Sequence, residues 1–171
     1  MNATVVTACV VALKAFAWPD LEHWKGLRPD CGLPAVSEAW AYADDGWRGS
    51  GYVGEEPRAL TWISATGKGF PDSVRVWLDG PRVVMLETQV LGKASDLKAL
   101  VAKLGEPAAK LDAFFEVKME KSEWVYPNRG LTLYVNPENH ILLRAVGYAP
   151  TTLENYRRHL RPITRPRAHA R

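Results

Sequence analysis

Residues 49–54 match the glycine pattern of nucleotide-binding loops, with the sequence Gly49-Ser50-Gly51-Tyr52-Val53-Gly54. In a dinucleotide-binding fold this pattern follows a hydrophobic strand and opens a helix, whose N-terminus receives the phosphates. Here Glu55 and Glu56 follow the pattern and would repel a phosphate, and Pro57 disfavours helical backbone at the residue before it. We therefore interpret residues 49–54 as a glycine-rich strand or loop and predict no nucleotide cofactor.

The side chains that ligate metals or act as nucleophiles are scattered along the chain. The four histidines are His23, His140, His159 and His169. They show no paired metal-ligand spacing, and the two cysteines are 22 residues apart. Ser50 has Arg48 where a Gly-x-Ser-x-Gly nucleophile elbow needs glycine. A dyad of Cys31 with His23 or His140 would require the fold to bring them together, and a structural cysteine is the simpler interpretation. We predict no catalytic residue, no metal site and no cofactor.

The elements that would position any site can be assigned from hydrophobic periodicity. Helical spacing of apolar residues predicts helices over 34–43 and 95–104, and Pro107 suits the start of a third, short helix through Leu111. Thr151 and Glu154 form a capping box for a last helix that ends near residue 160. Alternating or β-branched segments predict the main strands over 60–65, 74–79, 82–90, 115–119, 124–126, 131–135 and 141–148.

This order of elements predicts an α+β protein with antiparallel sheet and helices packed on one face. It also allows two tandem αα-ββββ repeats followed by a C-terminal helix. A weak repeat at an offset of 73 residues supports the tandem form, because Gly-x-Pro-Ala occurs at residues 32–35 and again at 105–108. Chance or shared capping chemistry explains these identities equally well. The predicted division is a first half over 1–92, a second half over 93–160 and a basic flexible tail over 161–171.

The charge of the 171-residue chain is distributed unevenly. Residues 151–171 carry six arginines and one glutamate, so this end contributes +5 to a net charge of +3 and leaves −2 for residues 1–150. A basic tail is able to contact nucleic acid, but a solvated terminus is the simpler interpretation, so we expect no other nucleic-acid contact. No apolar run approaches the ~20 residues that span a bilayer, so we expect no membrane segment.

Cys9 and Cys31 permit one disulfide at most, and the sequence leaves open whether they pair. We interpret them as two small buried thiols. Residues 1–16 are apolar but lack the basic start of a signal peptide, and Lys14 interrupts the apolar run. We therefore expect them to belong to the fold, and the protein to be cytoplasmic. The abundance of Ala and Arg is typical of a GC-rich bacterial genome.

Seven tryptophans make aromatic residues the most unusual part of the composition. Trp24 and Trp40 lie on apolar helix faces and are predicted to be core. If Val74 and Val76 face the helices, the alternation of the strands places Trp, Tyr and Arg side chains on the opposite face. These three residue types are enriched at protein–protein hot spots. The predicted partner-binding residues are Arg75, Trp77, Trp124, Tyr126, Tyr134, Arg144 and Tyr148. The alternative is that another layer covers this face.

Three short motifs carry a resemblance to known families. They are Leu104-Gly105-Glu106-Pro107, Trp124-Val125-Tyr126 and Gly130-Leu131. With the order helix, helix and four strands, apparently repeated, the chain resembles the beta-lactamase-inhibitor-protein family. Its second half, residues 95–148, is similar in pattern to the small lipoproteins of the outer-membrane assembly machinery. The resemblance implies a concave sheet, rich in aromatic residues, that grips another protein.

These observations predict a non-catalytic protein-binding module of the inhibitor or immunity type, with a partner such as a co-encoded toxin or enzyme. The alternative is a small-molecule-binding or enzymatic α+β domain whose pocket is lined by the same aromatic residues. The shape of the aromatic face distinguishes the two functions. A closed apolar cavity with convergent polar groups favours a small ligand, whereas an open, shallow face favours a protein.

Overall fold

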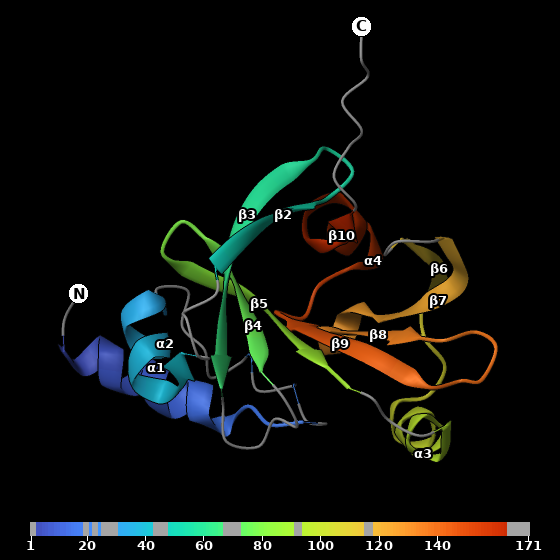
Figure 1. Ribbon diagram of the computed structural model, residues 1–171, viewed down its shortest axis with the longest axis horizontal. Coiled ribbons are helices and arrows are strands. Elements are labelled where there is room, and N and C mark those ends of the chain that lie inside the picture. Colours follow the sequence, from blue (N-terminus) through green and yellow to red (C-terminus); the bar gives the residue numbers. More distant parts are fainter. Residues whose placement is uncertain are drawn as a thin grey trace, which may run out of the picture.

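The computed structural model describes residues 3–18, 21, 24, 31–42, 48–66, 73–90, 94–114 and 118–163. Nine strands form one antiparallel sheet in the order β10-β2-β3-β4-β5-β9-β8-β7-β6, and the short strand β1 pairs with β3. The sheet curls into a half-barrel (Figure 1). The strands are β1 (Ala41–Tyr42), β2 (Arg48–Val53), β3 (Arg58–Thr66), β4 (Val74–Asp79), β5 (Arg82–Gln89), β6 (Ala109–Phe114), β7 (Lys118–Tyr126), β8 (Leu131–Val135), β9 (Leu142–Tyr148) and β10 (Pro162–Ile163).

Four α-helices occur in the described part of the chain, and all are short. They are α1 (Ala3–Ala15), α2 (Leu33–Ala39), α3 (Ala94–Leu104) and α4 (Leu153–Asn155). A 3₁₀ turn (Pro127–Arg129) precedes β8, and α4 runs directly into a π-helical turn, η4 (Tyr156–Leu160). Among the helices of the described residues, none is both long enough and apolar enough to cross a membrane.

The predicted fold class, α+β with helices packed on one sheet face, is wrong. The molecule is predominantly sheet, and its strands form a single continuous half-barrel rather than a layer beneath helices. Two meanders, β2 to β5 and β6 to β9, join because their last strands, β5 and β9, pair antiparallel. The predicted boundary between residues 92 and 93 falls between the meanders, which share this one sheet.

Three of the four helix predictions are confirmed, with shifted ends, and one is wrong. Helices occur at 33–39 and 94–104, although α2 ends early because Trp40 adopts extended backbone. The helix expected from Pro107 to Leu111 is instead the start of β6, which pairs with β7. The second Gly-x-Pro-Ala therefore leads into a strand, whereas the first opens α2. The final helix is capped by Thr152, one residue beyond the predicted capping box.

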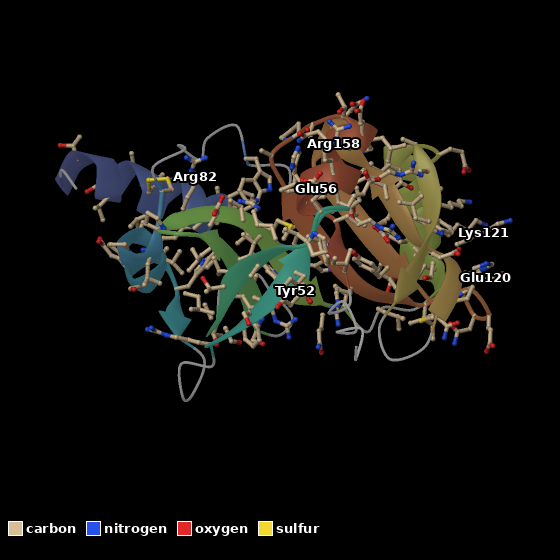
Figure 2. The ribbon with its side chains drawn as sticks, turned by 90° about the horizontal axis from the view of Figure 1, so that it is seen from above. Tyr52, Glu56, Arg82, Glu120, Lys121 and Arg158 are labelled. Atoms are coloured by element: carbon tan, nitrogen blue, oxygen red, sulfur yellow. A yellow bond between two sulfur atoms is a disulfide. The ribbon has the colours of Figure 1, made fainter. Side chains whose placement is uncertain are left out.

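Cys9 and Cys31 form a disulfide, so their interpretation as two free thiols is wrong (Figure 2). Both residues are completely buried, and the bond ties α1 to the segment that precedes α2. That segment also joins the sheet, because Val83 of β5 donates its backbone N–H to the carbonyl of Cys31. The predicted inclusion of the N-terminal residues in the fold is confirmed by α1, whose Leu13 is part of the core.

The two faces of the sheet carry different cores. The outer core combines α1, α2 and α3 with strand residues such as Val76 and Leu133, and it includes Trp24 and Trp40 as predicted. The inner core lies within the curve of the half-barrel, where α4, η4 and β10 are located (Figure 1). Its residues are Val53, Leu60, Trp77, Met85, Ala113, Val125, Tyr134, Val146, Tyr148 and Tyr156. Both cores take residues from each side of the 92/93 boundary.

The C-terminal segment belongs to the inner core up to Ile163. Tyr156 stacks on Tyr148 with ring centroids 5.0 Å apart, and β10 pairs with the end of β2. Residues 161–163 of the predicted flexible tail are therefore part of the fold. The remaining tail residues, 164–171, lie outside the described residues, as do the strand residues predicted at 115–117.

The glycine pattern at residues 49–54 lies mostly in β2, which confirms its interpretation as a glycine-rich strand. Gly49 pairs with Trp62 of β3, and the Trp62 ring occupies the space that a Cβ at Gly49 would need. A Cβ at Gly51 would lie 2.5 Å from Cη2 of Trp77. The glycines therefore give two tryptophan rings room to lie against the backbone of β2.

Replacing both cysteines by alanine is expected to lower the free energy of unfolding by about 2–4 kcal/mol, because the unfolded chain gains the freedom that the bond removes. Urea unfolding of the Cys9→Ala/Cys31→Ala variant, and of the native protein with and without reductant, measures this loss. Alkylation of both cysteines in the unreduced, folded protein would contradict the bond.

Gly51→Ala is expected to destabilise the protein by about 1–3 kcal/mol, because the Trp77 ring is buried and cannot move aside. Ser50→Ala is the matched control, since Ser50 is exposed on the same strand, and it should change stability by less than about 0.5 kcal/mol. Equal midpoints of the two variants in thermal unfolding would disprove the close approach of the ring.

Candidate functional site

A row of polar side chains crosses the inner face of the sheet. Ser64 of β3, Arg75 of β4 and Glu87 of β5 are direct cross-strand neighbours in the register. Arg144 of β9 pairs with Gln89, two residues beyond Glu87 on the same strand. Because alternate residues of a strand share a face, all five side chains lie on the inner face. The regular antiparallel register thus places a carboxylate between two arginines.

Glu87 is the centre of this row. Its side chain is only 4% exposed and accepts hydrogen bonds from Arg75 Nη1 at 3.1 Å and from Trp77 Nε1 at 2.8 Å. Arg144 Nη1 lies 2.8 Å from the same carboxylate. A buried carboxylate needs such donors, since an unpaired charge out of water is very costly. Two guanidinium groups therefore face this one carboxylate.

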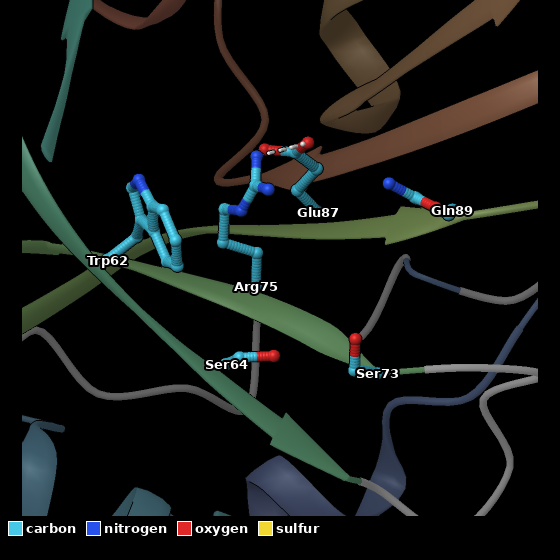
Figure 3. Close-up of a pocket in the computed structure, with 6 residues that line it drawn as sticks. All are labelled: Trp62, Ser64, Ser73, Arg75, Glu87 and Gln89. Carbon is cyan, nitrogen blue, oxygen red and sulfur yellow. Dashed lines mark hydrogen bonds and ion pairs between the residues drawn. The ribbon is translucent and has the colours of Figure 1, made fainter. Parts of the chain in front are cut away.

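A cavity of about 350 Å³ lies beside Arg75 on the inner face, and we call it the Trp62 cavity. Trp62, Ser64, Ser73, Arg75, Glu87 and Gln89 line it (Figure 3). The Arg75 guanidinium lies over the Trp62 ring, 4.3 Å from its centroid, which is a cation–π contact. Arg75 is 33% exposed, so the charge presented to this cavity is positive.

Deeper in the half-barrel, a smaller cavity of about 150 Å³ lies between the sheet and β10. It shares Arg75 and Glu87 with the Trp62 cavity and extends to Arg144 and Glu123. The Arg75–Glu87 pair therefore stands between the two cavities. The deeper one ends at a second buried carboxylate.

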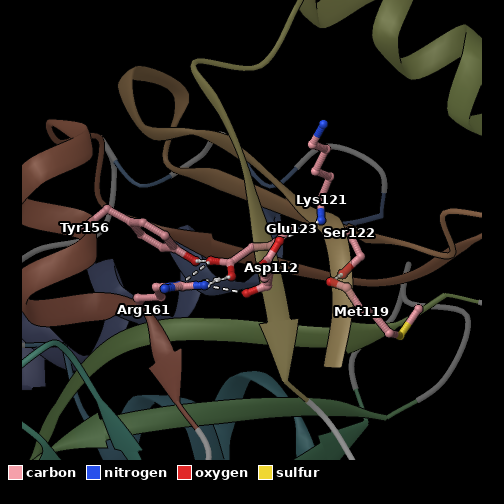
Figure 4. A network of polar contacts seen from close by, with 7 residues as sticks. All are labelled: Asp112, Met119, Lys121, Ser122, Glu123, Tyr156 and Arg161. Atoms are coloured by element: carbon pink, nitrogen blue, oxygen red, sulfur yellow. Dashed lines mark hydrogen bonds and ion pairs between the residues drawn. The ribbon is translucent and has the colours of Figure 1, made fainter. Parts of the chain in front are cut away.

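This second carboxylate, Glu123 of β7, is 1% exposed and holds the C-terminal segment (Figure 4). Arg161 donates to both of its oxygens from Nε at 3.0–3.2 Å and from Nη2 at 2.9 Å. The Tyr156 hydroxyl donates to Oε1 at 2.7 Å. Arg161 Nη2 also donates to the backbone carbonyl of Asp112, so it links β6 and β7 to the end of the chain.

The ionisation of this cluster favours the bonded form. Burial raises the pKa of the Tyr156 hydroxyl well above its usual value, and electrostatic coupling to Tyr134 and to the Glu123 carboxylate adds to the effect. Tyr156 therefore remains a hydrogen-bond donor at neutral pH. Burial alone would lower the pKa of Arg161, but the hydrogen bonding to Glu123 and the negative charge of Glu123, with smaller contributions from Tyr156 and Tyr134, together outweigh it, and the pKa is raised.

The seven predicted partner-binding residues divide into three groups. Arg75 and Arg144 line cavities of the inner face and are partly exposed. Trp77, Tyr134 and Tyr148 lie on the same face, as the strand alternation predicts, but all three are buried in the inner core. Trp124 and Tyr126 lie with the outer core, on the other side of the sheet. The alternative that a further layer covers part of the face is confirmed for Tyr148, which Tyr156 covers.

Sequence reasoning missed the residues that complete the site: Trp62, Ser64, Ser73, Glu87, Gln89, Glu123 and Arg161. A signal for Glu87 was present, because this acid directly follows the four apolar residues Val83–Leu86 in a predicted strand. Glu123 carries no such signal, since lysines and other glutamates surround it in the sequence. Trp62 alternates with Ile63 in a predicted strand, so its face could have been assigned.

The groups that could transfer a proton are occupied or exposed singly in the described part of the chain. The carboxylates of Glu87 and Glu123 on the inner face are buried and paired with arginine. Cys31 is consumed by the disulfide, and His140 and His159 are exposed, while His23 and His169 lie outside the described residues. Within the described ranges, no three His, Cys, Asp or Glu side chains converge to hold a metal ion.

Arg161→Met is expected to lower the free energy of unfolding by about 3 kcal/mol, because it leaves a buried carboxylate without its cation. Arg158→Met is the matched control: this arginine belongs to the same segment but pairs with Glu154 in an exposed position, and its loss should cost less than about 1 kcal/mol. Adding Glu123→Gln to Arg161→Met should recover part of the stability. Urea unfolding measures all three variants, and equal losses for Arg158 and Arg161 would contradict the role of Glu123.

Comparison with known proteins identifies no relative of this chain. No protein-family model, no curated protein and no solved structure matches the chain. The resemblance to the beta-lactamase-inhibitor-protein family stays a prediction, and the function has to be inferred from the inner face itself.

Proposed function

We propose that the protein is a non-catalytic binding module for another protein, of the inhibitor or immunity type, and that it receives its partner on the inner face. One observation carries this proposal: the part of the inner face that the C-terminal segment, as far as it is described up to Ile163, does not cover presents Trp62, stacked on a partly exposed Arg75, beside a cavity with charged and polar end groups. Trp and Arg are the residue types that contribute most to protein–protein affinity. A co-encoded toxin or enzyme is the class of partner that we propose.

The binding surface differs from the one that the sequence indicated. Trp77, Tyr134 and Tyr148 are buried and hold the half-barrel together, so they cannot be contact residues without unfolding the inner core. Arg75 and Arg144 remain, and Trp62 replaces the buried rings as the aromatic anchor. Ordered aromatic and arginine side chains lose little conformational entropy on binding, which favours affinity.

A small-molecule-binding function is the second candidate, and the size of the Trp62 cavity favours it. A volume of about 350 Å³ is at the low end of the ~300–1,000 Å³ that ligand pockets occupy. Trp62 is, however, the one residue of an apolar type among the six that line this cavity, and the other five carry charged or polar end groups. These end groups favour a polar or charged group of a protein partner over an apolar small molecule.

The cytoplasmic location expected from the sequence belongs to this proposal, but the Cys9–Cys31 bond counts against it. Disulfides persist in oxidising compartments and are rare in the cytosol. The partner would then be met outside the cytoplasm, and the oxidation state of the two cysteines in the source cell decides between the two locations.

Trp62→Ala is expected to reduce capture of the specific partner at least ten-fold, because truncating a hot-spot tryptophan costs about 2 kcal/mol or more. Trp124→Ala is the matched control, since Trp124 is also partly buried but lies on the outer face. Quantitative pulldown from the source cell with wild-type and variant proteins, each shown to be folded by circular dichroism, measures the effect. A partner lost with Trp124→Ala and retained with Trp62→Ala would refute the inner face as the binding surface.

A further inference from the structure

We propose that the Trp62 cavity binds a carboxylate, presented by an Asp or Glu side chain of the partner, and that the Arg75 guanidinium receives it. This inference rests on the proposed function and specifies the chemistry that the inner face recognises. It is carried by the charge balance, the orientation of Arg75 and the donors that line the cavity.

The charge balance of the row favours an anion. Arg75 and Arg144 both lie against the single carboxylate of Glu87, whereas Glu123 is paired with Arg161. The side chain of Arg75 is 33% exposed and that of Glu87 is 4% exposed. The charge that reaches the cavity is therefore the positive charge of Arg75. A cation in this cavity would be repelled by the Arg75 guanidinium. The Glu87 carboxylate would not attract it, because Glu87 already interacts with Arg75, Arg144 and Trp77.

Arg75 is held in one orientation before any ligand arrives. The Trp62 ring supports the face of its guanidinium at 4.3 Å, and Glu87 fixes one of its nitrogens, Nη1 (Figure 3). An arginine carries five N–H donors in a planar fork, so the bond to Glu87 uses only part of its capacity. A planar, pre-oriented fork is the geometry that binds a carboxylate with two parallel hydrogen bonds.

Neutral donors accompany the guanidinium in the same cavity. Ser64 is the direct cross-strand neighbour of Arg75, and Gln89 lies two residues beyond Glu87 on β5. A hydroxyl and a side-chain amide are both able to donate to the further lone pairs of a carboxylate. The Trp62 cavity therefore combines one available cation with neutral donors, and its one acid is already satisfied.

A partner's side chain fits this cavity better than a free small carboxylate. An isolated ion pair at a partly exposed arginine contributes little affinity in water. Trp62 is the one aromatic ring among the residues that line the cavity, so a small molecule finds a single stacking surface there. A polypeptide supplies the missing contacts by covering the surrounding inner face, which excludes water from the ion pair and strengthens it.

The test titrates the ¹⁵N-labelled full chain with two capped peptides, acetyl-Gly-Glu-Gly-amide and acetyl-Gly-Gln-Gly-amide, and separately with sodium acetate. We expect the Glu peptide to shift the Trp62 indole N–H and the Arg75 Nε–H signals, and the Gln peptide and acetate to bind more weakly and to shift these signals less at the same concentration. Equal affinities of the two peptides would overturn the carboxylate site. Acetate that binds as tightly as the Glu peptide would overturn a partner side chain as the source.

Arg75→Gln should abolish the shift at Trp62, whereas Arg58→Gln, which removes another arginine of the same sheet, should leave it unchanged. Arg75→Gln is expected to fold, because Arg144 and Trp77 still donate to Glu87. Unchanged binding of the Glu peptide by folded Arg75→Gln would refute the role of Arg75. If partner capture depends on Trp62 while the Glu peptide does not bind, the carboxylate site fails and the proposed function stands. If capture does not depend on Trp62, the proposed function fails whatever the peptides show.

Discussion

The carboxylate of Glu123 is buried beneath the C-terminal segment, and that burial is tolerable only because Arg161 and Tyr156 donate to it. An unpaired carboxylate in this position would cost several kcal/mol, so β7 and the end of the chain are required to meet. This one interaction holds η4 and β10 inside the curve of the sheet. The rest of the inner face depends on this interaction, because the apolar side chains on the inner surface of a half-barrel have to be covered by another segment.

The C-terminal segment fills that surface only in part. Where it lies, Tyr156 covers Tyr148 and the rings are buried as core. Beyond it, the face carries Trp62, Arg75 and Arg144, and the Trp62 cavity remains. The binding site that we propose is therefore the portion of the inner face that the C-terminal segment up to Ile163 leaves uncovered. Glu87 has in this portion the role that Glu123 has under the C-terminus, since it holds the surrounding donors in place.

Local patterns identified several elements correctly, and they failed where pairing between strands overrides local preference. The apolar spacing from Leu97 to Leu104 is strong, and α3 forms there. The segment from Pro107 to Leu111 has a helix-like start, yet it becomes β6 because an edge of the sheet is available to it. A hydrogen-bonded partner strand contributes more than the small difference in intrinsic propensity. The disulfide escaped prediction for a similar reason, since two cysteines 22 residues apart carry no sign of their proximity.

Strand alternation, which can be read from the sequence, assigned five of the seven predicted partner-binding residues to one face correctly. Arg75, Trp77, Tyr134, Arg144 and Tyr148 all lie on the inner face, because a side-chain period of two is a property of the strand alone. Trp124 and Tyr126 lie on the outer face. Which of the inner-face residues meet solvent is set by the tertiary structure. Exposure depends on the curl of the sheet and on where η4 and β10 are held. Those depend on contacts such as Arg161 with Glu123, between residues 38 positions apart, which no local pattern records.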